Sequence, residues 1–163
     1  MRSFDAVATK LARLRRTDHP HMILAGALLT DESGRFLLMR RSTPGTNWWE
    51  VPGGKIEPGE SPWTAARREL LEELRVTIEF VDLIASERFV WEGQNLQYTW
   101  FVARVAKGTP GITERDRFDQ IRYFTWDEIR SLHNPSPSLK CLRGLQVAPP
   151  ALNAKLPMAT PAI

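Results

Sequence analysis

Apolar runs separated by polar turns predict strands in the first part of this sequence. Residues 22–30, MILAGALLT, are almost continuously apolar, which is typical of a buried strand. The polar residues 31–34 are typical of a turn, and the apolar residues 36–39 predict a returning strand. We therefore expect a β-hairpin whose second strand ends in Arg40 and Arg41.

A helix is predicted over residues 62–74, where apolar side chains recur at helical spacing. Ser61 is a good N-cap and Pro62 suits the first helical position. Leu70 and Leu74 fall on one face, which can anchor the helix to a core. Carboxylates crowd the rest of the same helix.

Strand spacing returns after this helix. Aromatic and β-branched residues predict further strands at residues 76–84, 87–92, 96–105 and 120–126. Turns or loops are expected at residues 44–47, 93–95 and 107–111. We expect the aromatic side chains from Trp91 to Phe101 to pack in the core rather than stack on a base. Thr125 and Glu128 have capping-box spacing, which predicts a short helix through Leu132.

The two ends of the chain differ in composition from its centre. Residues 3–16 predict a basic amphipathic helix that packs on the domain or on a second subunit. A targeting peptide has a similar pattern, but the acidic Asp5 argues against it. Prolines are concentrated near the C-terminus, which favours an extended tail. We therefore expect an N-terminal amphipathic helix, one folded domain and a Pro-rich tail, at residues 1–20, 21–143 and 144–163.

The composition fits a globular protein with one core, since 42% of the 163 residues are apolar and 25% are charged. The net charge is only +3 and there is no long run of Lys or Arg, so we expect no stable nucleic-acid partner. The single cysteine, Cys141, excludes an internal disulfide and fits a reducing, cytoplasmic location. No apolar run is long enough to span a membrane. A monomer or a homodimer is expected.

Three carboxylates carry the most specific chemistry. Glu69, Glu72 and Glu73 stand at i, i+3 and i+4 of the predicted helix, so their side chains should converge on one side. Oxygen-only ligands favour a hard divalent cation, Mg²⁺ first and Mn²⁺ next. A solvated acidic helix face is the alternative for these three residues alone. The upstream Gly53-Gly54 turn favours the metal site, because it lets backbone approach a ligand and offers a carbonyl.

The segment around these residues resembles a known family motif. From Gly54 the chain reads G, five residues, Glu60, seven residues, and then RELLEELRV over residues 68–76. This resembles the Nudix box, G-x5-E-x7-R-E-U-x-E-E-x-G-U, where U is aliphatic, and the preceding WEVPGG resembles the family's W-x-x-P-G-G. The resemblance implies an α/β fold, an α/β/α sandwich with a mixed central sheet. It also implies metal-dependent hydrolysis of a nucleoside diphosphate linked to another group.

One position departs from the family pattern, because Arg75 stands where the family has glycine. That glycine normally ends the helix in a left-handed conformation. A non-Gly residue there costs roughly 1 kcal/mol, or else the helix ends differently. Arg75 carries no carboxylate, so its presence leaves the metal ligands intact.

The resemblance implies a role for most polar residues of the box. Metal ligation falls to the three glutamates and the Gly54 carbonyl, and Glu69 corresponds to the general base of similar enzymes. Arg68 is expected to orient a glutamate through a charge-assisted hydrogen bond. Glu60 should support the loop or the outer metal shell, and Lys55 can reach phosphate as a point charge.

The segment PGGKIE, at residues 52–57, is particularly similar to the MutT branch of the family. This similarity implies a small-molecule nucleotide substrate, most simply a nucleoside triphosphate hydrolysed to a monophosphate and pyrophosphate. Arg40 and Arg41 also resemble that branch and are candidates to contact the nucleotide, with a solvated strand end as the alternative. Asn134 is a candidate to contact the base, with a simple turn as the alternative.

Other functions stay open. The substrate can instead be a nucleotide sugar, ADP-ribose or a dinucleoside polyphosphate. A nucleotide-binding sensor without turnover usually lacks box carboxylates, which are all present here, and an isomerase would want a catalytic cysteine in the sheet rather than the late Cys141. Similar enzymes often use a further acidic residue outside the box. The candidates are Glu114, Asp116 and Asp119, each with a solvated loop as the alternative.

Overall fold

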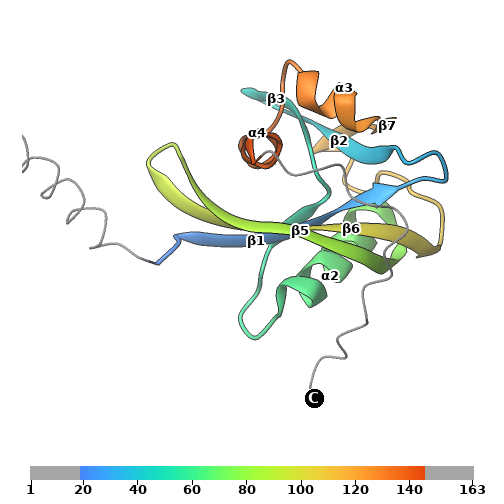
Figure 1. Cartoon of the computed structure of the whole chain (residues 1–163), viewed down its shortest axis with the longest axis horizontal. Helices are drawn as coiled ribbons and strands as arrows, with labels where there is room; N and C mark the ends of the chain where they lie inside the picture. Colours follow the sequence, from blue (N-terminus) through green and yellow to red (C-terminus); the bar gives the residue numbers. More distant parts are fainter. Residues whose placement is uncertain (1–18, 146–163) are drawn as a thin grey trace, which may run out of the picture.

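The structure, a computed structural model, describes residues 19–145 and contains a seven-stranded sheet (Figure 1). Its strands are β1 (Met22–Thr30), β2 (Phe36–Thr43), β3 (Thr46–Glu50), β4 (Gly53–Lys55), β5 (Thr77–Trp91), β6 (Gln94–Lys107) and β7 (Phe118–Phe124). They lie in the order β3, β2, β1, β6, β5, while β4 pairs with β1 and β7 pairs with β2. The β1–β6 pair is parallel and the other pairs are antiparallel. The sheet is therefore mixed, as predicted.

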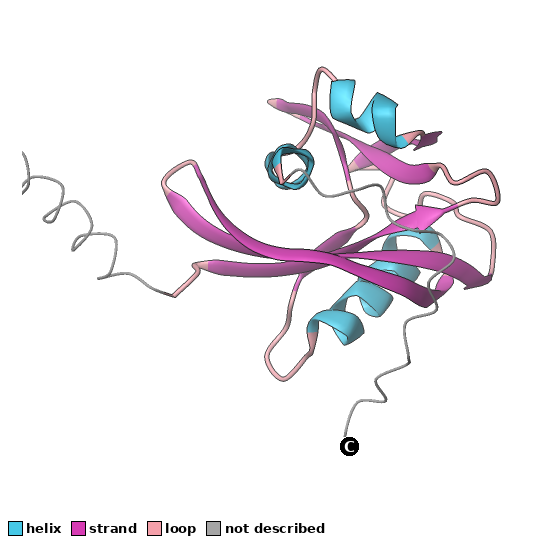
Figure 2. Cartoon of the chain, viewed as in Figure 1, coloured by secondary structure: helices cyan, strands magenta, loops and turns pink. Residues whose placement is uncertain are grey.

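Helices cover both faces of this sheet (Figure 2). Helix α2 (Pro62–Leu74) lies on one face, while α3 (Trp126–Ser131) and α4 (Pro137–Gly144) lie on the other. Side chains of each strand alternate between two cores, so that Leu29 packs with α2 and Leu28 packs with residues of α3 and α4. This arrangement confirms the predicted α/β/α sandwich.

Helix α2 begins as its sequence predicts and ends in the first of the two ways left open for Arg75. The Ser61 hydroxyl accepts a hydrogen bond from the Thr64 amide at 3.1 Å, and Pro62 follows at the first helical position. Arg75 ends the helix in the left-handed region, with φ 58° and ψ 34°, and its amide donates to the Leu71 carbonyl. The helix thus ends as a glycine would end it, and Arg75 bears a strain of roughly 1–2 kcal/mol.

The first hairpin is longer than its apolar pattern predicts. Strand β2 continues through Arg40 and Arg41 to Thr43, and the expected loop at residues 44–47 shortens to a tight turn before β3. The register pairs Arg41 with Trp48. The strand extends past its predicted end because backbone pairing with β3 continues to Thr43, where the side chains carry no apolar pattern.

Strand β5 is a single element of 15 residues rather than the two predicted strands. Its register with β6 shifts between Leu83 and Ala85, near the predicted break, and pairing then resumes. Glu92 and Gly93 form a two-residue turn with φ of 48° and 74°, shorter than the predicted turn at residues 93–95. The resulting hairpin projects beyond the rest of the sheet (Figure 1).

Two features near the C-terminal end differ from the prediction. Trp126 begins α3 instead of ending β7, although the predicted capping box is present: the Thr125 amide donates to the Glu128 carboxylate at 2.7 Å. Helix α4 occupies a Pro-rich segment for which no helix was predicted. Ser136 caps this helix and Pro137 takes its first position, so proline starts the helix rather than preventing it.

The predicted helix at residues 3–16 and most of the predicted tail lie outside the described residues. Gly144 and Leu145, the first two residues of that tail, instead end α4. Between residues 19 and 145, no helix has both the length and the apolar character that crossing a membrane requires.

Candidate active site

Glu73 is a buried carboxylate on α2, with a relative exposure of 1%. Its Oε2 accepts a hydrogen bond from the Gly53 amide at 3.0 Å, which ties the helix to the Gly-Gly turn. Burial raises the pKa of Glu73 well above its ordinary value, and the nearby Glu69 and Glu50 charges raise it further. Within residues 19–145, no ion pair to Glu73 offsets this burial.

Glu69 lies directly against the backbone of Gly54. A Cβ atom added to Gly54 would lie 2.5 Å from Oε1 of Glu69, so only glycine allows this approach. Arg68 donates from Nη1 to the same oxygen at 2.9 Å. Burial nevertheless raises the pKa of Glu69 above its ordinary value. The Gly54 position and the Glu69 carboxylate therefore form one compact unit.

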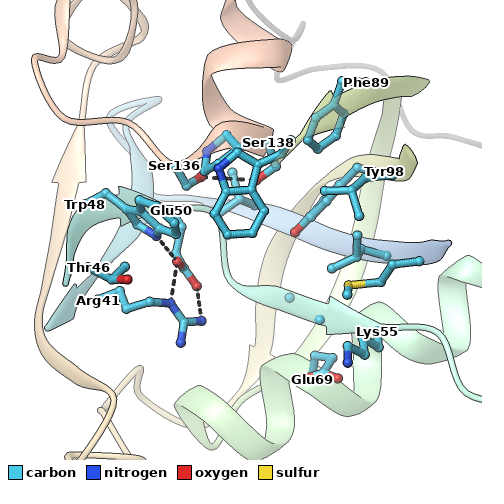
Figure 3. Close-up of a pocket in the computed structure, with 18 of the residues that line it drawn as sticks. Arg41, Thr46, Trp48, Glu50, Lys55, Glu69, Phe89, Tyr98, Ser136 and Ser138 are labelled. Carbon is cyan, nitrogen blue, oxygen red and sulfur yellow. Dashed lines mark hydrogen bonds and ion pairs between the residues drawn. The ribbon is translucent and has the colours of Figure 1, made fainter. Parts of the chain in front are cut away.

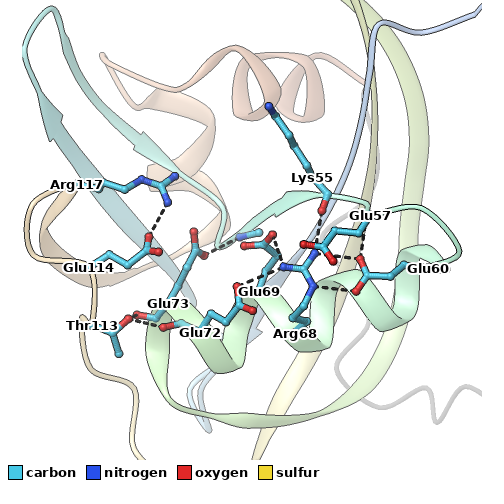
Figure 4. Close-up of polar contacts among 11 residues, drawn as sticks. Lys55, Glu57, Glu60, Arg68, Glu69, Glu72, Glu73, Thr113, Glu114 and Arg117 are labelled. Carbon is cyan, nitrogen blue, oxygen red and sulfur yellow. Dashed lines mark hydrogen bonds and ion pairs between the residues drawn. The ribbon is translucent and has the colours of Figure 1, made fainter.

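Arg68 joins the loop to the helix (Figure 4). Its Nε donates to Glu60 at 2.8 Å, and its Nη2 donates to the Lys55 carbonyl at 3.0 Å. The hydrogen bonds from Arg68 lower the pKa of Glu60 to about 2. Arg68 also reaches Glu72, at 3.3 Å, whose side chain is 54% exposed. These contacts give Arg68 and Glu60 the orienting and loop-supporting positions that the box predicts.

The side chains of Glu69, Glu72 and Glu73 lie on the same side of α2 (Figure 4), but they point in different directions. No cluster of three or more His, Cys, Asp or Glu side chains in residues 19–145 is arranged to hold a metal ion. The Gly53 amide draws Glu73 inward, whereas Arg68 draws Glu72 outward. The donors still fit a hard divalent cation, because the buried Glu73 and the partly buried Glu69 lie close to the Gly53-Gly54 backbone and a cation would offset their charge.

A cavity of about 550 Å³ opens beside Glu69 and the Gly53-Gly54 backbone. Lys55 and Glu69 lie at one end, whereas Phe89, Ser136 and Ser138 lie at the other (Figure 3). The full lining is Met22, Leu24, Arg41, Thr43, Thr46, Trp48, Glu50, Val51, Gly53, Gly54, Lys55, Glu69, Phe89, Trp91, Leu96, Tyr98, Arg117, Ser136, Pro137 and Ser138. The cavity thus has a charged end and an end rich in aromatic and apolar groups.

The aromatic end is built from strands that are distant in sequence. Trp91, near the tip of the β5–β6 hairpin, meets Trp48 of β3 edge to face, with ring centroids 5.8 Å apart. Phe89 and Tyr98 of the same hairpin also line the cavity. The expectation that Trp91 packs in the core was therefore wrong, whereas Tyr98 is buried and forms part of the cavity wall.

The sequence profile of the NUDIX domain matches residues 20–142, which is most of the chain. The chain belongs to the Nudix family. It is therefore a Nudix hydrolase, a class that acts on phosphoric anhydrides and generally uses divalent metal ions. The box residues Arg68, Glu69, Glu72 and Glu73 lie within the matched range.

Relatives of this Nudix hydrolase differ in name and in length. An RNA pyrophosphohydrolase from Rickettsia africae is 28% identical over 136 residues, which cover 72% of this chain and 83% of the relative. Nudix hydrolase 5 from Arabidopsis thaliana is 32% identical over 120 residues, which cover 70% of this chain but 38% of that protein. The crystal structure of a MutT NUDIX hydrolase from Burkholderia pseudomallei matches with a TM-score of 0.66 and 25% identity, covering 76% of this chain and 95% of that one.

The structure separates the substrate-binding candidates of this Nudix hydrolase. Arg41 and Lys55 line the cavity. Arg40 instead donates from Nε to Asp119 at 2.8 Å, and neither residue lines the cavity. The side-chain amide of Asn134 donates from Nδ2 to the backbone carbonyl of Asn47 at 3.3 Å, which fits the alternative that Asn134 belongs to a simple turn. In place of Asn134, α4 presents Ser136 and Ser138 to the cavity.

Of the three acidic candidates outside the box, Glu114 lies nearest the carboxylate cluster. Its charge contributes to the raised pKa values of both Glu69 and Glu73. Arg117 donates to Glu114 at 2.7 Å and also lines the cavity (Figure 4). Asp116 is exposed.

Sequence reasoning missed Glu50 and Arg117 as cavity residues. Strand alternation could have indicated Glu50, because Trp48 and Glu50 are two residues apart and so face the same side of any strand that contains both. Arg117 gave no pattern, because it lies before β7 and reaches the cavity through the folding of its loop.

Proposed function

We propose that this Nudix hydrolase cleaves a nucleoside triphosphate to a monophosphate and pyrophosphate. The observation that carries the proposal is the two-ended cavity. Its aromatic end offers Trp48, Trp91 and Phe89 to a base, and its charged end offers cations beside buried carboxylates to a polyphosphate. A volume of about 550 Å³ falls within the range of small-molecule sites.

The box residues have the following roles in this proposal. Glu69, Glu73 and the Gly54 carbonyl would hold Mg²⁺, or Mn²⁺, with Glu72 as a further ligand. A bound ion of this kind offsets phosphate charge and acidifies water. Arg68 holds Glu69 and the loop in place through its hydrogen bonds to both.

Hydrolysis needs one bond made and one broken. A water oxygen attacks phosphorus, the bridging oxygen leaves with pyrophosphate, and the proton of the water passes to Glu69. Burial raises the pKa of Glu69 above its ordinary value, which improves its basicity. Lys55 and Arg41 lie at the same cavity and would orient the phosphates.

A second candidate is the 5′-triphosphate end of RNA. It is favoured by the relatives named RNA pyrophosphohydrolase, and it contains the same anhydride. Solved structures named Ap4A hydrolase, from C. elegans, and UDP-X diphosphatase share the fold at 20% and 18% identity, which carries no argument about substrate.

Turnover against a substrate panel tests the proposal. The panel contains nucleoside triphosphates, a 5′-triphosphate RNA oligomer, a nucleotide sugar, ADP-ribose and a dinucleoside polyphosphate, each with Mg²⁺. We expect a monophosphate and pyrophosphate from a nucleoside triphosphate, with the activity lost in Glu73→Gln. Cleavage of the RNA end alone, or of a sugar or dinucleotide alone, would overturn the nucleoside triphosphate assignment. Tight binding without any turnover would favour a sensor.

A further inference from the structure

Glu50 lies outside the box, and the mechanism above gives it no role. Its carboxylate accepts three hydrogen bonds from two residues that line the cavity (Figure 3). Arg41 donates from Nε at 2.9 Å and from Nη2 at 2.7 Å, one bond to each carboxylate oxygen. The Trp48 indole N–H donates at 2.6 Å to the same oxygen that receives the Arg41 Nε–H. One side chain thus connects a cation with an aromatic ring.

This arrangement fixes the orientation of Arg41. The two parallel bonds form a bidentate pair, which constrains the plane of the guanidinium as well as its position. The guanidinium also lies over the buried Phe118 ring, 4.8 Å from its centroid. The side chain of Glu50 is 12% exposed, so water competes little for the pair. Arg41 is therefore held from two sides while it borders the cavity.

The strand register explains why these three side chains meet. Arg41 and Trp48 are directly opposite one another in the β2–β3 pair. Glu50 stands two residues beyond Trp48 and shares its face of the sheet. The carboxylate consequently lies between the aromatic end and the charged end of the cavity.

We propose that Glu50 is a positioning residue for substrate binding, which holds Arg41 toward the phosphates and Trp48 toward the base at a fixed separation. The proposal rests on the nucleotide hydrolase function above. This positioning role and simple charge repulsion predict opposite effects on substrate affinity when the charge of Glu50 is removed. A lone carboxylate beside a polyphosphate repels it, so removing the charge of Glu50 would by itself tighten binding. Removing a positioning residue weakens binding instead.

Binding of an α,β-methylene nucleoside triphosphate with Mg²⁺, measured by calorimetry, distinguishes the two roles without requiring turnover. Glu50→Gln replaces one acceptor oxygen with a donor, which cannot satisfy the Arg41 fork. We expect the Kd to rise about tenfold, as for the loss of one charge-assisted hydrogen bond. The KM of turnover should rise in parallel, while kcat stays within about threefold. In an Arg41→Ala background the same substitution should have a much smaller effect on Kd.

Two further variants keep the experiment decisive. Asp119→Asn breaks a similar bidentate pair, with the adjacent Arg40, away from the cavity, and should leave the Kd unchanged. Glu50→Asp keeps the charge but is one methylene shorter, so it should also weaken binding, and it serves if Glu50→Gln fails to fold.

The possible results separate the two levels of the proposal. The positioning role alone is overturned if the Kd of Glu50→Gln is unchanged or tighter than that of wild type. It is also overturned if Glu50→Gln weakens binding as much in the Arg41→Ala background as in wild type. A wild-type protein that neither binds the analogue nor hydrolyses any nucleoside triphosphate overturns the proposed function, and the role of Glu50 with it.

Discussion

Two regions of the cavity differ in how the charges of their carboxylates are balanced. At the box end, the Glu73 carboxylate is buried and the Glu69 carboxylate is partly buried, and burial raises the pKa values of both. Farther along the cavity wall, between its charged end and its aromatic end, Glu50 is matched by Arg41 in a bidentate pair. Glu73 has no ion-pair partner among residues 19–145, so its charge is poised to bind a cation, whereas the paired charge of Glu50 holds geometry. The difference indicates which of these two regions performs chemistry and which positions the substrate.

Glu73→Gln should have the largest effect and should separate activity from stability. We expect turnover to fall by about 10³-fold, because a preorganised charge at the reacting phosphate is lost. The metal-free protein should become more stable by roughly 1–3 kcal/mol, because a buried uncompensated charge is removed. Steady-state kinetics and thermal melts in a chelator measure the two effects. Glu72→Gln, at a half-exposed position, should change the melts little, and a destabilised Glu73→Gln would contradict the account.

The free energy of unfolding of the metal-free protein should depend on pH through Glu73. The folded-state pKa of Glu73 lies well above its ordinary value of 4.5, so the unfolded chain loses its proton first. This contribution to the free energy of unfolding is greatest below pH 4.5 and is lost as the pH rises through the folded pKa. Mg²⁺ should reverse the loss and should release protons on binding, which calorimetry in two buffers of different ionisation enthalpy detects.

Arg68→Lys should have the next largest effect, because lysine keeps the charge but cannot make the several directed bonds of Arg68. Turnover is expected to fall by about 10–100-fold, as for other groups that orient metal ligands. Arg67→Lys, at the neighbouring position on α2, is the matched control and should stay within about twofold of wild type. Equal losses in both variants would indicate a general effect on the helix.

The acid stability of Arg68→Lys provides an independent measurement. Hydrogen bonds from Arg68 lower the pKa of Glu60 from 4.5 to about 2. The stability from this pair is therefore present above about pH 4.5 and is lost as the pH falls toward about 2. Arg68→Lys should consequently move the midpoint of acid unfolding to a higher pH.

Trp91→Ala should affect substrate affinity rather than chemistry. Loss of one stacking ring is expected to raise KM by about tenfold, with kcat nearly unchanged. The neighbouring Val90 is 68% exposed at the same hairpin, and Val90→Ala should leave both parameters unchanged. A tripolyphosphate substrate without a base should not distinguish Trp91→Ala from wild type. If it does, the aromatic end does not bind the base.

Arg40→Gln should have the smallest effect. Arg40 pairs with Asp119 at the surface and does not line the cavity, so kcat/KM is expected to stay within about twofold of wild type. Arg41→Gln should in contrast raise KM by about tenfold or more. Equal losses in the two variants would show that both arginines serve the substrate.

Much of the box end could be predicted because it is local in sequence. The spacing of Glu69 and Glu73 and the Ser61 cap follow from helix geometry, whereas the sequence left open whether Arg75 ends the helix in the left-handed region. What spacing could not give was the direction of each carboxylate. The Gly53 amide and Arg68 decide that direction, and the former comes from a different element.

The positioning end could hardly be predicted, for the opposite reason. Adjacent strand residues point to opposite faces, so the sequence could not tell which of Arg40 and Arg41 shares a face with Trp48, and the pairing with β3 places Arg41 opposite that residue. The meeting of Trp91 with Trp48 required a continuous β5 and the two-residue turn that follows it. Pattern alone placed a break in that strand.

The sequence by itself thus determined helix α2 and the identity of the box carboxylates, because these depend on contacts within a few residues, and the resemblance of the box to the family motif implied the family and its sandwich. Tertiary structure alone decided which arginine borders the cavity, which aromatic rings form its other end, and that Glu50 joins them. Backbone pairing between distant segments carries that information, and its register is not encoded in local spacing.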